Sequence, residues 1–299
     1  MFQEVNRNVE DILSRQLFFI AATEKSGTTW MQLMLDGHPE IVCRGEGQFV
    51  SKLAGSLGGG LKEYSSFIEG LNKNVFAETD GFPTFDRDDL SHLIRMSAGL
   101  LLSKYDITEN VRAVGEKTPG NVRYLQALLS LFPNAKFVLM VRDIRDIIVS
   151  GHVHLKRQHG KAGEELIQGY AKRVAKIWAQ DVARAQTFMA NNKERCVFVR
   201  YEDLHAQPLA SMKPVIDHLG VDSRSEMIEM CVEAGRFQNL SKGRERGQED
   251  INSQFRKGIV GDWQHVLDQA TRAIILEEAG ETLTALGYIN NDDWVASGG

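Results

Sequence analysis

A short apolar run that leads directly into a polar, glycine-containing turn constrains this chain more than any other feature. Leu17–Ala22 is apolar throughout, the turn 23–29 is polar, and apolar side chains then recur at helical spacing over residues 30–35. A continuous apolar run of this length is typical of a strand buried on both faces of a sheet. Because Gly37-His38-Pro39 ends the helical pattern, the segment predicts a strand, a loop and a helix in succession.

The same pattern recurs further along the chain. Lys136–Val141 is predicted to be a strand that leads into a helix over Asp143–His154, Cys196–Val199 is a third predicted strand, and Val111–Val114 is a fourth. Strands that alternate with helices predict an α/β fold, in which a parallel, P-loop-like sheet is covered by helices on both faces. With no internal repeat and no linker, residues 1–299 are expected to form a single domain.

Three longer segments lie between these elements. The apolar residues of Gly163–Asn192 recur at three- and four-residue spacing, which predicts an amphipathic helix. Gly55–Gly60 is glycine-rich and Ser241–Ser253 is polar, and both are predicted to be loops.

Composition narrows the class of partner and the compartment. The net charge of −5 gives no reason to expect a nucleic acid partner. The longest apolar run is too short to span a membrane, and the first residues lack the cationic and apolar regions of a signal peptide, so we expect a cytoplasmic protein without a membrane span. Cys43, Cys196 and Cys231 are odd in number and far apart, which favours neither a disulfide framework nor a zinc site. The oligomeric state stays open.

The turn after the first predicted strand has the properties of a phosphate-binding loop. It lies at the start of a helix, where free backbone N–H groups and the helix dipole favour an anion. Lys25 adds a positive charge, and hydroxyl groups add hydrogen-bond donors. The pattern differs from that of nucleotide triphosphatases, because the lysine precedes the single glycine.

The order of residues in this loop resembles the 5′-phosphosulfate loop of sulfotransferases that use 3′-phosphoadenosine 5′-phosphosulfate (PAPS). The matching residues are Lys25, Ser26, Gly27, Thr28, Thr29 and Trp30. The resemblance implies that Lys25, Thr28 and Thr29 hold the 5′ end of PAPS and that Trp30 contacts adenine.

Two distant segments resemble the parts of the family that bind the 3′-phosphate. Arg142 at a strand end is followed by Ser150 in the next helix, and residues 256–263 read Arg-Lys-Gly-Ile-Val-Gly-Asp-Trp. The resemblance implies that Arg142, Ser150, Arg256, Lys257 and Gly258 bind the 3′-phosphate of PAPS and of its product, adenosine 3′,5′-bisphosphate (PAP), and that Tyr201 lies beside the adenine.

Two carboxylates are candidates for the catalytic base. Glu46, a short way after His38-Pro39, occupies the position of the base in heparan sulfate and tyrosylprotein sulfotransferases, and a carboxylate there can accept the acceptor's proton. The segment Glu116-Lys117-Thr118-Pro119 resembles one in which the lysine contacts the transferring group, so Lys117 takes that role and Glu116 is the second-choice base. Cytosolic sulfotransferases carry a catalytic histidine in the comparable segment, and this chain does not.

The sequence therefore predicts a sulfotransferase that transfers the sulfuryl group of PAPS to a hydroxyl or amine by in-line attack, with a glutamate base and without a metal. The acceptor is expected to be a small molecule, a lipid or a carbohydrate, and a peptide tyrosine is also open. Residues 50–110, where the resemblance is weakest, are an expected acceptor-side insertion, and residues 236–263 are an expected donor-covering loop. The alternatives are a kinase-like phosphotransferase and a non-catalytic bisphosphate-binding protein.

Overall fold

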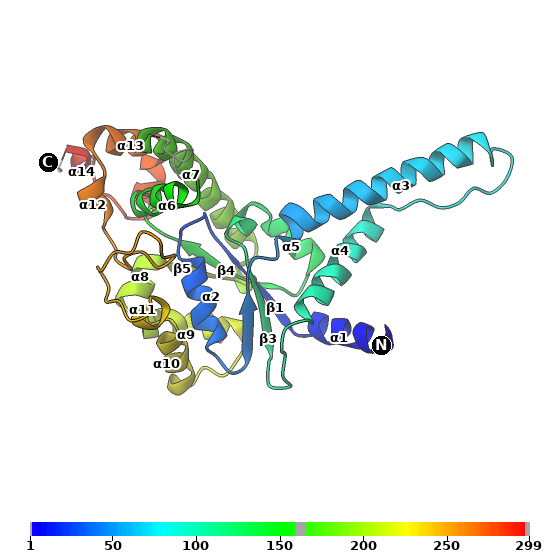
Figure 1. Cartoon of the computed structure of the whole chain (residues 1–299), viewed down its shortest axis with the longest axis horizontal. Coiled ribbons are helices and arrows are strands. Elements are labelled where there is room, and N and C mark those ends of the chain that lie inside the picture. The colour runs from blue at the N-terminus through cyan, green and yellow to red at the C-terminus, as the bar shows by residue number, and fades with distance from the viewer. Residues whose placement is uncertain (1, 160–165, 297–299) are drawn as a thin grey trace.

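The centre of the molecule is a five-stranded parallel sheet (Figure 1). The structure is a computed structural model that describes residues 2–159 and 166–296. In chain order the strands are β1 (Gln16–Ala21), β2 (Ile41–Arg44), β3 (Ala113–Lys117), β4 (Lys136–Val141) and β5 (Cys196–Arg200), arranged in space as β2-β3-β1-β4-β5. All four neighbouring pairs are parallel, which confirms the predicted fold class. The carboxyl ends of the strands consequently meet at one edge, where ligands of such sheets commonly bind.

The central strand β1 divides the core into two halves. Phe18 and Ile20 pack on one face of the sheet, while Leu17 and Phe19 pack on the other, as the two-residue period of a strand requires. The first face is covered by α2 (Thr28–Asp36), α8 (Tyr201–Ala206), α9 (Pro208–Leu219) and α10 (Ser225–Ala234). The second face is covered by α1 (Phe2–Ser14), α4 (Arg87–Leu102), α5 (Leu125–Leu131) and α7 (Ile167–Asn191). The strand is therefore buried on both sides, as its unbroken apolar sequence predicts.

A helical layer beyond β4 forms a third part of the core. It consists of α6 (Ile144–His159), α7, α12 (Trp263–Val266), α13 (Gln269–Ala285) and α14 (Asp293–Ala296), packed around the fully buried Trp178. The helix α6 continues beyond its predicted end at His154. The helix α7 confirms the predicted amphipathic helix, although residues 163–165 of that prediction lie outside the described residues.

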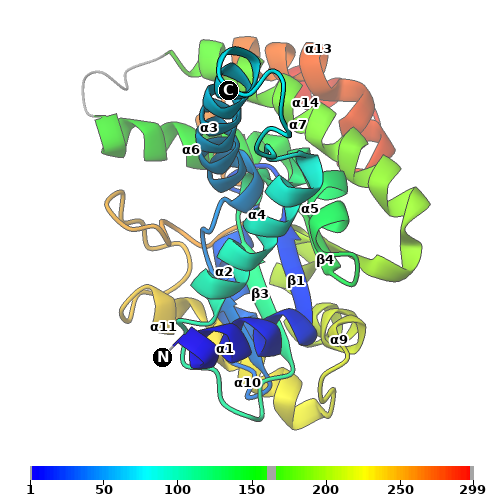
Figure 2. The ribbon, with the colours of Figure 1, turned by 90° about the vertical axis from the view of Figure 1, so that its right-hand side faces the viewer.

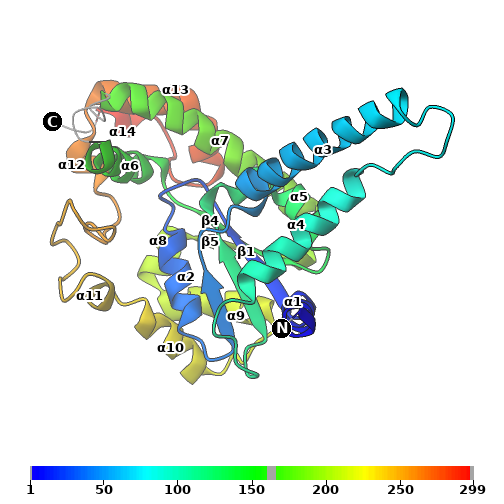
Figure 3. The same ribbon diagram turned by 45° about the vertical axis from the view of Figure 1, so that its right-hand side comes forward.

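The prediction of a loop at Gly55–Gly60 is wrong. A short π-helical turn, η1 (Phe49–Leu53), leads into the 21-residue helix α3 (Ala54–Asn74), which contains all of these glycines. Helix α4 doubles back along α3, and a Cβ atom on Gly58 would lie 3.3 Å from Leu90, so the two helices approach closely there. Packing along this contact outweighs the low helix propensity of glycine. The resulting hairpin projects from the body of the molecule in Figures 1 and 3 and points toward the viewer in Figure 2.

Other differences between the sequence prediction and the structure concern which helices and strands form and where they begin and end. Helix α1 and strand β2 were not predicted, and β3 spans Ala113–Lys117 rather than the predicted Val111–Val114, so it includes two candidate site residues. The polar segment Ser241–Ser253 contains neither helix nor strand and follows the short helix α11 (Phe237–Leu240), as predicted for a loop. Among the described helices, none is long and apolar enough to cross a membrane.

Candidate functional site

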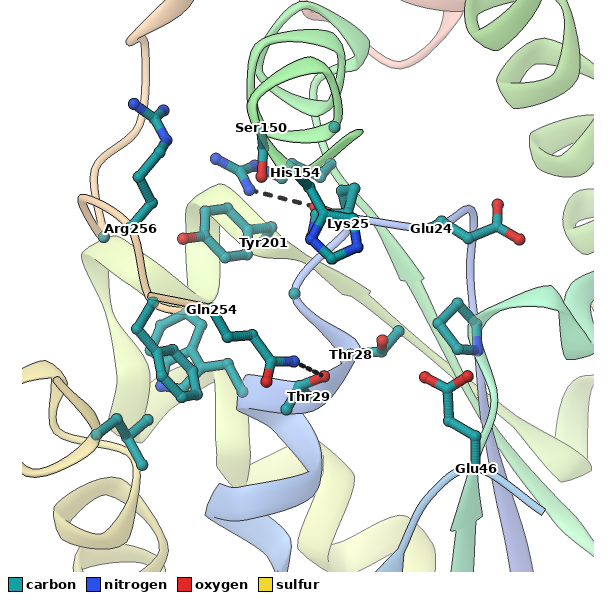
Figure 4. A pocket seen from close by; sticks show the side chains of 18 of the residues that line it. Glu24, Lys25, Thr28, Thr29, Glu46, Ser150, His154, Tyr201, Gln254 and Arg256 are labelled. Carbon is teal, nitrogen blue, oxygen red and sulfur yellow. Dashed lines mark hydrogen bonds between the residues drawn. The ribbon is translucent and has the colours of Figure 1, made fainter. Parts of the chain in front are cut away.

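A cavity of about 860 Å³ opens at the carboxyl edge of the sheet (Figure 4). The loop after β1, the start of α8, one side of α6 and residues 254–259 contribute to its walls. Most of the predicted site residues line it: Lys25, Gly27, Thr28, Thr29, Trp30, Glu46, Arg142, Ser150, Tyr201, Arg256, Lys257 and Gly258. Ser26, Glu116 and Lys117 are buried behind the walls, at 1–4% exposure. The fold thus brings together residues that are more than 200 positions apart in the chain.

The loop between β1 and α2 curves tightly around the base of the cavity. Lys25 and Gly27 both have left-handed backbone conformations, with φ angles of 70° and 88°. A Cβ atom on Gly27 would lie 2.5 Å from the ring of Tyr201, so only glycine fits there. Within the described part of the chain, the hydroxyl of Ser26 is buried and has no hydrogen-bond partner. Together with the N-terminus of α2, this arrangement forms a concave, donor-rich surface suited to an anion.

The electrostatic environment of Lys25 also favours an anionic ligand. Burial, together with the neighbouring charges of Arg157, Arg142 and Lys117, lowers the pKa of Lys25 to about 8, and Glu46 acts in the opposite direction. Cations that repel one another at close range are stabilised when a polyanion binds between them. The base of the cavity is therefore positively charged before any ligand arrives.

Arg142 links this loop to two other parts of the site. One guanidinium nitrogen donates to the carbonyl oxygen of Lys25 at 3.2 Å, and the guanidinium lies 4.1 Å from the ring centre of Tyr201. Asp146, one turn further along, lies 3.7 Å from Arg142 and accepts hydrogen bonds from the backbone of Gly261 and Trp263. Among the described residues, no hydrogen-bond partner reaches the buried Nε atom of Arg142.

Residues 241–262 form a loop that closes one side of the cavity. Gln254 in this loop donates to the hydroxyl of Thr29 at 3.2 Å (Figure 4). Arg256 forms ion pairs with Glu249 and Asp262, and the ammonium of Lys257 lies 2.8 Å from Asp262. The Nε atom of Arg256 is also buried and finds no hydrogen-bond acceptor among residues 2–159 and 166–296. Arg256 and Lys257 are thus held by carboxylates of the same loop.

The two candidate base residues have different surroundings. The side chain of Glu46 is 40% exposed and lies in the cavity, on the opposite side from Arg256 (Figure 4), and it accepts a hydrogen bond from Lys117 at 2.8 Å. Glu116 is only 3% exposed and does not line the cavity. One of its carboxylate oxygens accepts hydrogen bonds from the backbone N–H of Gly47 and the hydroxyl of Thr118.

Glu116 is consequently a structural anchor in its position on β3. Its second carboxylate oxygen accepts a hydrogen bond from Asn121 at 2.8 Å. Burial raises the pKa of Glu116, and its hydrogen bonds act in the opposite direction. Because the backbone N–H of Gly47 donates a hydrogen bond to Glu116, Glu116 holds in place the segment that contains Glu46.

Several cavity residues were not singled out in the sequence. Arg157 lines the cavity beside His154, to whose ring nitrogen it lies within 2.7 Å. One face of α6 carries Ser150, His154 and Arg157, which are spaced by four and three residues. This helical spacing is the pattern in the sequence that could have indicated Arg157 as a site residue. Arg123 bridges Glu24 and the buried Asp181, and no pattern in the sequence indicated this pairing.

Among residues 2–159 and 166–296, no group of three or more histidine, cysteine, aspartate or glutamate side chains is arranged to hold a metal ion.

Comparison with known proteins identifies the family. The model of the sulfotransferase family matches residues 18–225. A candidate protein-tyrosine sulfotransferase of Caenorhabditis briggsae is 25% identical over 281 residues, which cover 91% of this chain and 89% of that protein. Protein-tyrosine sulfotransferase 2 of Gallus gallus is 30% identical over 207 residues, covering 69% of this chain but only 51% of that protein. The chain thus spans about half the length of some relatives and most of others.

Solved structures agree in fold. A mouse sulfotransferase complexed with PAP has a TM-score of 0.54 at 17% identity, covering 96% of this chain and 95% of that one. A sulfotransferase from Alicyclobacillus acidocaldarius has a TM-score of 0.50 at 19% identity, covering 94% and 99%. Since the family model matches more than half of the chain, this protein belongs to the sulfotransferase family and is a sulfotransferase.

Proposed function

We propose that the sulfuryl donor is PAPS, with its 5′ end at the loop after β1 and its 3′-phosphate near Arg142 and Arg256. The presence of two separate cationic groups in one cavity is the observation that carries this proposal. The oxygen atoms of such a ligand suit three buried atoms that have no partner in the part of the chain that the structure describes: Ser26 Oγ, Arg142 Nε and Arg256 Nε. Membership of the sulfotransferase family sets aside the kinase-like and non-catalytic alternatives.

The remaining residues of the cavity have corresponding roles. Lys25, Thr28 and Thr29 hold the 5′-phosphosulfate, Ser150, Lys257 and Gly258 contribute to the 3′-phosphate site, and Trp30 and Tyr201 contact the adenine. The indole of Trp30 donates to the carbonyl of Gly235 at 2.7 Å, which fixes its ring at the edge of Tyr201. When bound, PAPS supplies the sulfuryl group that passes to the acceptor as its bond to the 5′-phosphate oxygen breaks.

Glu46 is the proposed base. It is the carboxylate that is both in the cavity and in contact with Lys117. Its carboxylate accepts a hydrogen bond from Lys117, and a carboxylate in the cavity can accept the acceptor's proton. Lys25, at the base of the cavity, stabilises the negative charge that develops on the leaving phosphate oxygen. Glu116 acts through Gly47 as a positioning residue for Glu46.

For the acceptor we propose the phenolic hydroxyl of a tyrosine in a protein chain. The relatives named as protein-tyrosine sulfotransferases support this class over the small-molecule, lipid and carbohydrate acceptors expected from the sequence. The cavity also offers apolar and aromatic surface at Pro119, Tyr124 and Leu155 for a ring.

The function is tested with labelled PAPS and two peptides that differ only by tyrosine or phenylalanine at one position. Transfer to the tyrosine peptide alone supports the proposal. Transfer to simple phenols or sugars but to no peptide would overturn the acceptor class, whereas absence of PAP binding, measured by calorimetry, would overturn the donor assignment. Binding of 5′-AMP, which lacks the 3′-phosphate, is expected to be at least about tenfold weaker than binding of PAP.

A prediction concerns Glu249, whose carboxylate pairs with the cations that are proposed to bind the 3′-phosphate. Glu249 pairs with Arg256 and lies 3.7 Å from Lys257. Because a ligand phosphate must displace it, Glu249→Gln is expected to bind PAP about two- to fivefold more tightly, a change in the range of a partly exposed ion pair. Calorimetric titration with PAP measures this change. Glu245→Gln, in the same loop, is the matched control, and weaker PAP binding by Glu249→Gln would mean that Glu249 orders the loop instead.

A further inference from the structure

His205 joins the body of the protein to the loop of residues 241–262. It lies in α8, one helical turn after Tyr201, and it lines the cavity. Its Nε2 atom lies 2.9 Å from the carbonyl oxygen of Gly258, which belongs to the loop. The centre of its ring lies 6.2 Å from that of Tyr201 and 6.4 Å from that of Trp30. One side chain of α8 therefore contacts both the proposed adenine site and the loop.

The position of Gly258 determines where the cations proposed to bind the 3′-phosphate lie. Its backbone is left-handed, with a φ angle of 63°, and a Cβ atom there would lie 2.4 Å from the ring of Phe237. Only glycine fits so close to this ring. Arg256 and Lys257 immediately precede Gly258 in the chain. A shift of Gly258 would consequently move the backbone of both cations.

The loop is also attached to the body of the protein upstream and downstream of Gly258. Upstream, the exposed side chain of Gln254 donates to the hydroxyl of Thr29 at 3.2 Å. Downstream, Asp146 accepts a hydrogen bond from the backbone N–H of Gly261 at 2.8 Å. Between these two attachments, the contact of α8 with Gly258 fixes the stretch of the loop that carries the cations.

A single ring nitrogen of His205 faces two partners of opposite character. The guanidinium of Arg246 lies 3.0 Å from the same Nε2 atom that faces Gly258. A carbonyl oxygen only accepts a hydrogen bond and a guanidinium only donates one, so Nε2 can bond to one of them at a time. Burial, together with the charges of Arg246 and Arg142, lowers the pKa of His205, while the bond to Gly258 and the charge of Asp146 act in the opposite direction. The ring is therefore neutral at pH 7 and carries one N–H.

The surroundings favour the bond to Gly258 over the contact with Arg246. The bond to Gly258 is partly buried, whereas the contact with Arg246 is exposed. An exposed guanidinium can replace the ring by water, but a partly buried carbonyl that loses its donor is left poorly hydrated. The guanidinium of Arg246 also lies 5.8 Å from the ring centre of Trp30, which offers it a second partner. The hydrogen of the His205 ring therefore lies on Nε2.

We propose that His205 is a positioning residue: its Nε2–H group fixes the loop so that Arg256 and Lys257 select nucleotides that carry a 3′-phosphate. The inference rests on the proposed donor, PAPS, and adds a residue that acts on donor selection through the loop. The 3′-phosphate is remote from the sulfuryl group. Loss of the His205 bond should therefore weaken donor binding and leave the transfer step unchanged.

Two variants separate the hydrogen bond of His205 from its ring. Phenylalanine keeps an aromatic ring but has no N–H, whereas glutamine loses the ring and places an N–H group near the position of Nε2. The measured quantity is the ratio of the affinities for PAP and for 5′-AMP, which lacks the 3′-phosphate, because an effect on the adenine site cancels in this ratio. Calorimetry is expected to show a ratio about three- to tenfold lower in His205→Phe, the effect of one lost hydrogen bond, and a ratio within about twofold of the wild type in His205→Gln.

A matched control and a kinetic measurement accompany these variants. His265→Phe makes the same exchange at an exposed position of α12 that does not line the cavity, and it should leave the ratio unchanged. In steady-state transfer assays, His205→Phe should raise the KM for PAPS by about the same three- to tenfold and keep kcat within about twofold. A lower kcat at unchanged KM would overturn the proposal, as would an unchanged ratio in His205→Phe or an equal fall in His205→Gln.

Hydrogen exchange of the ligand-free protein tests the loop without any nucleotide. The backbone N–H groups of Gly247 and Asp250 donate to the carbonyls of Lys257 and Arg256, so they report on this part of the loop. Their exchange should be about three- to tenfold faster in His205→Phe and close to that of the wild type in His205→Gln. Unchanged exchange in His205→Phe would overturn the proposal. If the wild type binds PAP and 5′-AMP equally, the donor assignment fails instead, and the exchange rates still decide whether His205 fixes the loop.

Discussion

Glu46→Gln is expected to lower turnover by about 10²- to 10⁴-fold, the usual contribution of a general base. Glutamine is close in size and can still accept a hydrogen bond from Lys117, but it cannot take a proton from the acceptor. PAP binding should change little, because Glu46 lies on the opposite side of the cavity from Arg256 (Figure 4). Steady-state transfer assays and calorimetry with PAP measure the two effects separately.

Two further carboxylates serve as comparisons for this variant. Glu24 lines the same cavity but pairs with Arg123, so Glu24→Gln should retain turnover within about tenfold. Glu116→Gln should lower thermal stability, because it disturbs a buried carboxylate bonded to Gly47 and Asn121, and its loss of activity should be the smaller one. If Glu116→Gln abolishes turnover in a folded protein and Glu46→Gln does not, the base is Glu116.

Lys25→Met is expected to be the second most damaging change to activity and, at the same time, to stabilise the fold. Loss of one preorganised electrostatic donor costs about 10²- to 10³-fold in turnover. The pKa of Lys25 is lowered from 10.5 to about 8, so its charge opposes folding by on the order of 2–3 kcal/mol at neutral pH. Methionine fills a similar volume without that charge. Thermal denaturation of the ligand-free protein should therefore show a midpoint a few degrees higher.

The direction in which folding stability changes with pH follows from the lowered pKa of Lys25. Between pH 8 and 10.5 the unfolded chain binds a proton at Lys25 that the folded chain releases, so the destabilisation by Lys25 is full below pH 8 and fades above it. Wild-type affinity for PAP should also fall as the pH rises above about 8, since the neutral lysine attracts the anion less. In Lys25→Met this part of the pH dependence should be absent. An unchanged pH profile and a lower melting temperature would contradict the account of Lys25.

The sequence predicted the parts of the fold in which local pattern and tertiary packing agree. The unbroken apolar run of β1 and the polar loop after it are recognisable because a strand buried on both faces can contain little else. Strand β2 has only four residues, Ile41–Arg44, so its alternating pattern was too short to recognise. In α3 the glycines indicated a loop, and only the contact with α4, more than 25 residues away, makes that segment helical.

In the candidate site, too, local sequence patterns predicted some features, whereas tertiary packing decides others. The donor-side residues lie in contiguous motifs, so their grouping at one edge of a parallel sheet could be predicted. The sequence could not distinguish Glu46 from Glu116 as the catalytic base, because it does not reveal that Glu46 is 40% exposed and Glu116 only 3% exposed. Burial depends on how β2 pairs with β3, which is a property of the whole sheet.

The walls of the cavity come from residues between Glu24 and Ile259, which has a consequence for the order in which the site forms. During synthesis, the loop after β1 leaves the ribosome when most of the chain is still missing, and the cations at 256 and 257 follow only near the end. If the two phosphates of PAP bind as proposed, a nascent chain cannot engage both of them until nearly all of it has folded. In the finished protein, a bound ligand connects early and late parts of the chain, so it resists unfolding of either one.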